Sequence, residues 1–303
     1  MNKLQALSVI RLVIVLIIPL LLGRAIDAKA ETISIGTISS DPVGEIKLFT
    51  PFANYLAQEL SADGIDEVKI VIASDVRQMV KMLKHHEVDL FIDSSITASI
   101  INQLSGSQFM LRRWKKGRGK YRSVIFVTED SGIKRLDDLK DKVIAFEEPF
   151  STSGYVLPAL VILQSGNELY KLQSLRSEPE ADKVSYVMAY DNETQMVWLE
   201  RGRVAAAAMA ESDFLEYSNN VLVPLKSLYT TPYVPYHVVV RRPGLEERLV
   251  QRIKDVLLVA HEGKQGVEVM MSFEKTTKFD EIPDDLLSEI KKLEQYLGDV
   301  TVN

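Results

Sequence analysis

Short apolar runs alternate with amphipathic helical patterns along most of this chain, which is the pattern of an α/β protein. The β-branched and apolar runs predict strands over 32–38, 68–73, 88–92, 122–128, 143–146, 184–189, 203–209 and 234–241. Apolar residues at helical spacing predict helices over 49–60, 76–85, 96–104, 136–139, 151–166, 195–200, 245–261 and 284–297. No internal repeat or low-complexity linker interrupts the alternation.

Two of the predicted strands, 122–128 and 234–241, are candidates to connect two lobes. The first lobe would then use both ends of the chain, 31–128 and 232–303, and the second lobe would use 129–231. Each lobe is expected to hold a mixed sheet flanked by helices. A ligand would lie between the lobes, at the carboxyl ends of the strands.

The first thirty residues differ from the rest of the chain. Positive residues precede an apolar run over 12–22, which contains Pro19, and Ala28-Lys29-Ala30 follows as a small-x-small site. This layout predicts a signal peptide over 1–30, cleaved after Ala30. A membrane anchor is the alternative, but a spanning helix needs about 20 apolar residues and this run is much shorter.

Charge and cysteine content narrow the class of protein. Without residues 1–30, 32 Lys and Arg face 41 Asp and Glu, a net charge of −9, which argues against a nucleic-acid or anionic-membrane binder. No cysteine is present, so disulfides, thiolate metal sites and a lipid-modified cysteine after the signal are excluded. We therefore expect a periplasmic protein without a lipid anchor.

The segment 143–165, VIAFEEPFSTSGYVLPALVILQS, contains the most informative motif. A strand and a loop lead into Ser151, Thr152, Ser153 and Gly154, which open a helix. The first N–H groups of a helix lack internal partners and carry partial positive charge. Three adjacent hydroxyls and a residue without a side chain would complete an anion pocket made of neutral donors. A plain Ser or Thr N-cap is the simpler interpretation, and one hydroxyl can cap while the others bind.

This motif and its surroundings resemble the phosphate, phosphite and phosphonate binding components of ABC transporters, which are type II periplasmic binding proteins. The resemblance covers most of the chain after residue 30, including IGTISSDP, EVDLFIDSS, YDNETQMVWLERGRVAAAAM and YTTPYVPYHVVVRR. It implies a two-lobe fold, no enzymatic activity, no cofactor or metal, a monomer with one ligand, and an ABC permease and ATPase as partners.

Transferred onto this sequence, the resemblance implies that the hydroxyls of Ser151, Thr152 and Ser153 and the N–H of Gly154 hold the oxyanion. Further candidate ligand-binding residues lie in loops that would face the cleft: Ser39, Ser40, Ser94, Ser95, Tyr121, Glu148, Asn192 and His237. A carboxylate such as Glu148 would accept a hydrogen bond from a protonated oxygen, which favours a ligand that carries an O–H group.

Three positions depart from the pattern of the aminophosphonate-binding members. Ile92 stands where those members have a tyrosine, Asn192 replaces a histidine, and Ala210 stands in a region that is poorer in acidic and amide residues. These differences argue against an aminophosphonate and leave the oxyanion end intact.

Two other features have less specific explanations. The segment 112–122, RRWKKGRGKYR, holds seven positive charges and is expected to be a solvated hairpin loop, since charge runs usually face water. His85 and His86 are adjacent on a predicted helix, so their side chains diverge and do not chelate one ion.

The sequence therefore predicts a binding protein that delivers a phosphorus oxyanion to an ABC importer. A sensor subunit of the same fold is the alternative, which would bind another oxyanion or a small organic acid and signal to a membrane kinase or cyclase. A phosphoesterase is disfavoured, because the sequence offers neither a metal cluster nor a nucleophile–base pair.

Overall fold

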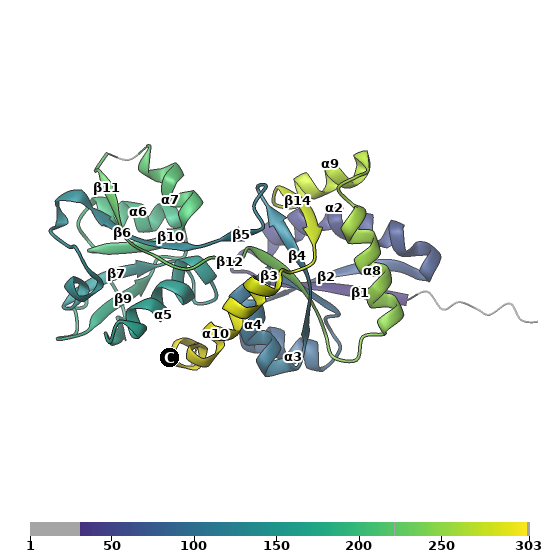
Figure 1. The fold of residues 1–303 in the computed structure, drawn as a ribbon, viewed down its shortest axis with the longest axis horizontal. Coiled ribbons are helices and arrows are strands. Elements are labelled where there is room, and N and C mark those ends of the chain that lie inside the picture. Colours follow the sequence, from purple (N-terminus) through teal and green to yellow (C-terminus); the bar gives the residue numbers. More distant parts are fainter. Residues whose placement is uncertain (1–30, 221, 302–303) are drawn as a thin grey trace, which may run out of the picture.

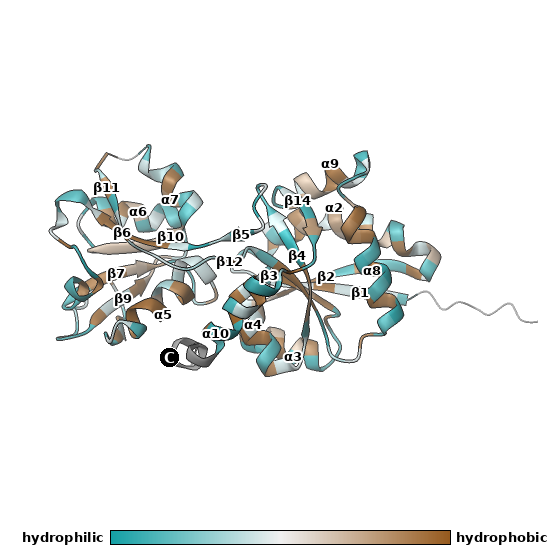
Figure 2. Cartoon of the chain, viewed as in Figure 1, coloured by the Kyte–Doolittle hydropathy of each residue, from teal (hydrophilic) through white to brown (hydrophobic). Residues whose placement is uncertain are grey.

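The computed structural model describes residues 31–220 and 222–301, which form two α/β lobes side by side. Figure 1 shows the lobes joined by two strands, with one long helix crossing between them. In Figure 2 hydrophobic positions concentrate on the strands and on the helix faces that cover them. Each lobe therefore has its own core.

The first lobe is built on a six-stranded sheet of order β14-β4-β13-β3-β1-β2. β1 runs parallel to β2 and β3, whereas β13 is antiparallel to β3 and β4, and β14 is antiparallel to β4. The strands are β1 (Glu31–Ile38), β2 (Ile65–Ala73), β3 (Leu90–Ser94), β4 (Gln108–Lys115), β13 (His237–Arg241) and β14 (Thr276–Asp280). The helices are α2 (Pro42–Leu60), α3 (Val76–Lys84), α4 (Ser95–Ser105), α8 (Glu247–Val259) and α9 (Lys264–Ser272).

The helices cover both faces of this sheet. One face buries an aromatic cluster in which Phe52 stacks on Phe273 at 4.6 Å between ring centroids. The opposite face buries Met79 and Leu83 of α3 against α4. At the start of α2, the Asp41 carboxylate accepts a hydrogen bond from the N–H of Gly44 at 3.0 Å, and Pro42 fits the first helical turn. This cap places the start of α2 directly after the carboxyl end of β1.

The second lobe holds a six-stranded sheet of order β11-β6-β10-β7-β9-β8. Its strands are β6 (Ser123–Thr128), β7 (Lys142–Phe146), β8 (Leu169–Lys171), β9 (Val184–Met188), β10 (Ala206–Ala210) and β11 (Leu225–Thr230). Its helices are α5 (Leu157–Gln164), α6 (Asn192–Glu200) and α7 (Glu211–Ser218), with short 3₁₀ turns at Glu129–Ser131 and Leu136–Leu139. Almost every residue of α5 is buried, so this helix packs inside the lobe.

Two strands and one helix span the junction between the lobes. β5 (Lys120–Tyr121) pairs antiparallel with β12 (Val234–Pro235) in a two-stranded ladder. α10 (Asp284–Thr301) contacts α4 of the first lobe, α5 of the second lobe and β12 (Figure 1). Ile290 of α10 is fully buried in a cluster that contains residues of both lobes. The terminal helix therefore ties the lobes together beside the two connecting strands.

The structure differs from the sequence expectation at several elements. The segment 123–128, assigned to the first lobe, is β6 of the second sheet, because it pairs with β10 and β11. The strand expected over 234–241 is divided at Tyr236, where the chain passes from the junction into the first sheet. β4, β5, β8, β11, β14, α7 and α9 were not predicted. The signal peptide expected over 1–30 lies outside the described residues.

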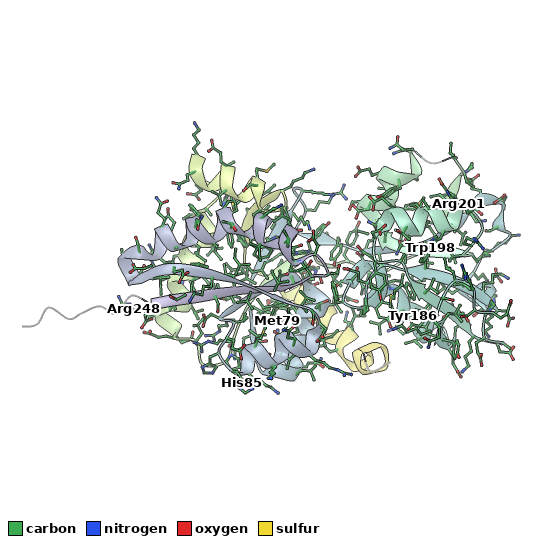
Figure 3. The ribbon with its side chains drawn as sticks, turned by 180° about the vertical axis from the view of Figure 1, so that it is seen from behind. Met79, His85, Tyr186, Trp198, Arg201 and Arg248 are labelled. Carbon is green, nitrogen blue, oxygen red and sulfur yellow. The ribbon has the colours of Figure 1, made fainter. Side chains whose placement is uncertain are left out.

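Within 31–220 and 222–301, the search for a helix with the length and hydropathy needed to cross a bilayer finds none. His85 and His86 are both exposed at the end of α3, and Figure 3 shows His85 at the outer edge of its lobe, away from the other lobe.

A candidate anion site between the lobes

The Ser-Thr-Ser-Gly motif lies where expected, at the start of the helix that follows β7. Thr152–Val156 forms a π-helical turn that continues into α5, and Ser151 is its N-cap. Ser151 Oγ accepts a hydrogen bond from the N–H of Gly154 at 3.0 Å and donates one to Glu147 Oε2 at 2.6 Å. The hydroxyl of Ser151 is thus used within the protein as a cap, as the simpler interpretation of the motif anticipated.

Thr152 and Ser153 keep more of their hydrogen-bonding capacity. Thr152 is 1% exposed, and its Oγ1 is buried without a hydrogen-bond partner among the described residues. Ser153 is also buried, and its carbonyl accepts a hydrogen bond from Ser123 Oγ at 2.6 Å. A buried polar atom without a well-formed hydrogen bond is costly, so Thr152 Oγ1, which has the Tyr121 hydroxyl nearby, retains capacity for a hydrogen bond to a ligand or water.

Gly154 is required by close packing over the helix start. A Cβ atom at this position would lie 2.4 Å from Oε2 of Glu147. The absence of a side chain therefore lets Glu147 lie directly against the first turn of the helix.

In the first lobe, the polar residues of the candidate site come from the carboxyl ends of β1 and β3. Asp93 is the next-to-last residue of β3 and accepts hydrogen bonds from Thr37 Oγ1 at 3.1 Å, from the N–H of Ile38 at 3.3 Å and from the N–H of Ser94 at 2.6 Å. Ser94 Oγ donates to Thr97 Oγ1 at 3.2 Å. Ser95 is fully buried and donates to the carbonyl of Pro235 at 2.7 Å, so its hydroxyl anchors α4 to the junction.

Among the described residues, two side-chain hydrogen bonds connect the lobes beside the motif. Ser40 Oγ, after β1, donates to Glu148 Oε1 at 2.6 Å. Thr97 Oγ1, on α4, donates to the carbonyl of Phe150 at 2.6 Å. Both acceptors lie in the loop that precedes Ser151. The lobes therefore touch next to the Ser-Thr-Ser-Gly motif.

An aromatic pair and a histidine lie where the chain crosses between the lobes. Tyr121 stacks on Tyr236 with ring centroids 4.3 Å apart and planes 12° apart. Burial raises the pKa of Tyr121 well above its ordinary value, and the Thr152 side chain close to its hydroxyl opposes the rise. Burial, with Arg113 and Lys115 adding to it, holds the pKa of His237 well below its ordinary value, and His237 Nδ1 has no partner within the described chain. His237 is therefore a neutral imidazole at neutral pH.

Carboxyl groups near the boundary between the lobes have raised pKa values. Burial raises the pKa of Asp93, Glu147 and Glu148, and hydrogen bonds to each of them oppose the rise. Burial, followed by repulsion from Glu274 and Asp93, raises the pKa of Glu45 at the start of α2 to about 7. Ionising these groups costs more than in water, so they share a proton readily with a neighbouring oxygen.

The basic segment 112–122 is only in part the solvated hairpin loop that was expected: Lys116, Arg118 and Lys120 are exposed around the turn between β4 and β5, but its first residues are not. Arg112 and Arg113 lie in β4 and are buried. Arg112 donates two hydrogen bonds to the Asp280 carboxylate, each at 2.8 Å, as a bidentate ion pair. Arg113 pairs with Glu274, and Lys115 lies 2.6 Å from the same carboxylate. Much of the positive charge is therefore neutralised inside the first lobe.

Two other sequence candidates have more peripheral positions. Ser39 Oγ accepts a hydrogen bond from the N–H of Asp41 at 3.0 Å, which shapes the loop before α2. Asn192 is the first residue of α6 and lines a separate cavity near the hairpin between β4 and β5.

Sequence reasoning did not single out Thr97, Asp93 and Glu45. Asp93 could have been found, because it directly follows a buried strand in LFIDSS. Thr97 could not, because its partner Phe150 lies 53 residues away and in the other lobe.

Two six-stranded lobes, a paired-strand junction and polar strand ends facing each other define a two-lobe periplasmic binding protein of type II. The family described as ABC transporter, phosphonate, periplasmic substrate-binding protein matches residues 35–287. The chain belongs to this family.

Known relatives agree with this assignment. The chain is 23% identical over 239 residues to the phosphonates-binding periplasmic protein of Escherichia coli strain K12, covering 77% of this chain and 67% of the relative. A Xanthomonas citri protein solved with a bound chloride ion has a TM-score of 0.83 at 24% identity, covering 89% of this chain and 98% of that one. A Prochlorococcus marinus protein solved with methylphosphonate has a TM-score of 0.65 at 16% identity, covering 89% and 99%. The two structural likenesses show the fold.

Proposed function

We propose that the chain captures a small phosphorus oxyanion, phosphonate, phosphite or phosphate, in the periplasm and delivers it to an ABC importer. The observation that supports this most directly is the buried Thr152 Oγ1, which has no partner within the described chain and lies in the first turn of a helix. The N–H groups of that turn and the side chains of Thr152 and Ser153 would bind the anionic oxygens. Ser151 would position this turn as its cap.

The carboxyl groups define which oxyanion fits. Glu148 and Glu147 are partly or largely buried beside the turn, and burial raises the pKa of both. An ionised carboxylate next to a fully ionised oxyanion is repulsive, whereas a shared proton forms a strong hydrogen bond. The site should therefore bind hydrogen phosphonate or phosphite more tightly than sulfate, which carries no proton at neutral pH.

The test is a double substitution that keeps the helix cap. Thr152→Val with Ser153→Ala removes two hydroxyls and retains Ser151. Each hydrogen bond to a charged group contributes about 1.5–3 kcal/mol, so the affinity for methylphosphonate measured by calorimetry should fall by a factor of about 100 or more.

The matched control is Ser165→Ala at the other end of the same helix. Ser165 Oγ donates to the carbonyl of Ile162 at 2.7 Å, so the variant loses a hydroxyl far from the proposed site. It should bind with unchanged affinity. Equal affinity of the double variant and the control would refute the anion site.

The proposed function includes export to the periplasm and an ABC permease and ATPase as partners. N-terminal sequencing of the exported protein should begin at Glu31 if the predicted signal peptide is cleaved, and light scattering should give the mass of a monomer. Permease and ATPase genes beside the coding sequence would support import. A neighbouring kinase or cyclase gene would instead indicate the sensor role.

A further inference from the structure

Three polar side chains form one row across the first sheet, at the end of β3 that leads into α4. Ser94, His237 and Arg113 are direct partners across β3, β13 and β4, so their side chains lie on the same face of the sheet. The next row on this face is apolar and consists of Ile92, Val239 and Leu111. The polar row is therefore the place where the core of the first lobe ends.

Two successive hydrogen bonds connect this row with the Ser-Thr-Ser-Gly motif. Ser94 Oγ donates to Thr97 Oγ1 at 3.2 Å, and Thr97 Oγ1 donates to the carbonyl of Phe150 at 2.6 Å. Phe150 belongs to the second lobe and directly precedes Ser151, the cap of the helix. The polar row and the motif therefore lie on the two sides of one boundary between the lobes.

Arg113 is the unusual member of the row, as a comparison with its neighbour Arg112 shows. Both arginines are buried in β4, and Arg112 donates from Nε and Nη2 to Asp280. Arg113 is 0% exposed and donates from Nη2 to Glu274, but its Nε and Nη1 are buried without a hydrogen-bond partner among the described residues. Unpartnered donors on a buried cation are costly, so these two nitrogens indicate that an acceptor from a ligand or water completes them.

His237 adds a second group of this kind at the directly opposed position. Its Nδ1 is buried and has no hydrogen-bond partner within the described chain. Burial and the nearby Arg113 keep this imidazole neutral, and Nδ1 donates a hydrogen bond when it carries the ring proton. Two adjacent strands therefore present unpartnered groups that suit a hydrogen-bond acceptor.

Charge restricts the nature of that acceptor. Arg113 and Lys115 pair with the same carboxylate, Glu274, so two cations meet one anion. The pKa values of the nearby Glu45 and Asp93 are raised by burial, so these groups supply less negative charge than ordinary carboxylates. A single carboxylate would balance the remaining positive charge, whereas a doubly charged phosphoryl group would exceed it.

We propose that Arg113 and His237 form a second anion subsite in the first lobe, which binds a carboxylate of the ligand while the phosphorus oxyanion lies at the Ser-Thr-Ser-Gly motif. The ligand class is then a phosphonocarboxylate. The proposal rests on the oxyanion function above and narrows its substrate class. A ligand with an acidic group at each end would contact both lobes and so favour the closed form.

The experiment compares phosphonoacetate with acetonylphosphonate, in which a methyl group replaces one carboxylate oxygen, by calorimetry on the exported protein. Phosphonoacetate should bind at least about 10-fold more tightly, the effect of a hydrogen bond to a charged group. Arg113→Lys keeps a cation beside Glu274 and removes the Nε and Nη1 donors, so it should lower that ratio at least about 5-fold. His237→Phe keeps a ring of similar size and should lower the ratio in the same direction.

Arg112→Lys is the matched control. Arg112 is a buried arginine on the same strand, but adjacent strand residues point to opposite faces, and its two donating nitrogens are already bound to Asp280. The ratio of the two affinities should therefore stay unchanged in this variant. Melting temperatures would show that each variant is folded.

Several results would overturn the proposal. A ratio near one in the unmodified protein would show that water alone completes Arg113, and this comparison requires no variant. Equal weakening of both ligands by Arg113→Lys would assign this side chain a structural role only. Tighter binding of methylenediphosphonate than of phosphonoacetate would exclude the carboxylate. Absence of binding for all these ligands and for methylphosphonate would instead refute the oxyanion function, so the two failures are distinguishable.

Discussion

The hydrogen bond from Thr97 to Phe150 provides a direct test of lobe closure. Thr97 is fully buried on α4 of the first lobe, and its hydroxyl donates to the Phe150 carbonyl in the second lobe at 2.6 Å. Thr97→Val keeps the shape of the side chain and removes the donor. In an open form water can satisfy the Phe150 carbonyl, so the substitution acts mainly on the closed form.

The expected size follows from the type of bond. A neutral intramolecular hydrogen bond contributes about 1 kcal/mol net, which is a factor of about 5 in the ratio of closed to open protein. If the free protein is mainly open, the apparent dissociation constant for methylphosphonate should rise by the same factor. Thr97 Oγ1 also accepts a bond from Ser94 Oγ, but both residues lie in one lobe, so its loss affects both forms equally.

Calorimetry measures the affinity, and small-angle scattering measures the radius of gyration with and without ligand. Thr276→Val is the matched control, because Thr276 is fully buried and donates to the carbonyl of Phe273 at 2.5 Å within the first lobe. Both variants should lose similar stability in urea, and only Thr97→Val should weaken binding. Indistinguishable affinities for the two variants would refute the assignment of this bond to closure.

Three further predictions concern stability. Glu274→Gln should lower the free energy of unfolding by about 3–5 kcal/mol in urea titrations, because it leaves the buried Arg113 uncompensated, whereas exposed Glu262→Gln should change it by less than about 0.5 kcal/mol. Ile290→Ala on α10 should cost about 2–5 kcal/mol and loosen the junction, seen as increased amide exchange in α4; unchanged exchange would contradict this role for α10. The folded protein holds the proton of Glu45 more tightly than the unfolded chain, since its pKa is about 7, so this group makes stability fall as pH rises from about 4.5 to 7. Glu45 is partly exposed, which reduces the effect to about 1–2 kcal/mol. Between pH 4.5 and 8, the free energy of unfolding should therefore fall by about 1–2 kcal/mol less in Glu45→Gln than in the parent protein.

Local patterns predicted most strands and helices because each lobe alternates them in the ordinary α/β manner. β4 escaped prediction because its sequence, QFMLRRWK, places two arginines next to each other. Their burial depends on Asp280 and Glu274, which lie more than 160 residues further along the chain. Nothing in the local pattern of 112–122 specifies those partners, so a solvated loop was the natural expectation.

The same limit applies to the candidate site. The helix start at 151–154 was predictable, since hydroxyls and glycine at a helix N-terminus have a local physical meaning. The division of roles among the three hydroxyls was not predictable, because it depends on the Glu147 side chain, which accepts the hydrogen bond of Ser151 Oγ. Ser95 was a candidate ligand-binding residue for a similar local reason. In the structure its hydroxyl instead donates a hydrogen bond to the carbonyl of Pro235, which lies 140 residues further along the chain.

The acidic surroundings of the cleft are consistent with an oxyanion ligand only if protons take part. Three cations of the β4 strand and its following turn are paired within the protein: Arg113 and Lys115 with Glu274, and Lys116 with Asp213. We therefore expect the proposed oxyanion to bind through neutral donors, beside Asp93, Glu147 and Glu148, whose pKa values are raised by burial. A ligand that carries its own O–H can share that proton with such a carboxyl, whereas a fully ionised ligand forces proton uptake from solution. Binding of hydrogen phosphonate should consequently take up fewer protons than binding of a dianion, and calorimetry in buffers of different ionisation enthalpy measures that difference. Equal proton uptake for both would show that the carboxyl groups do not select the protonated ligand.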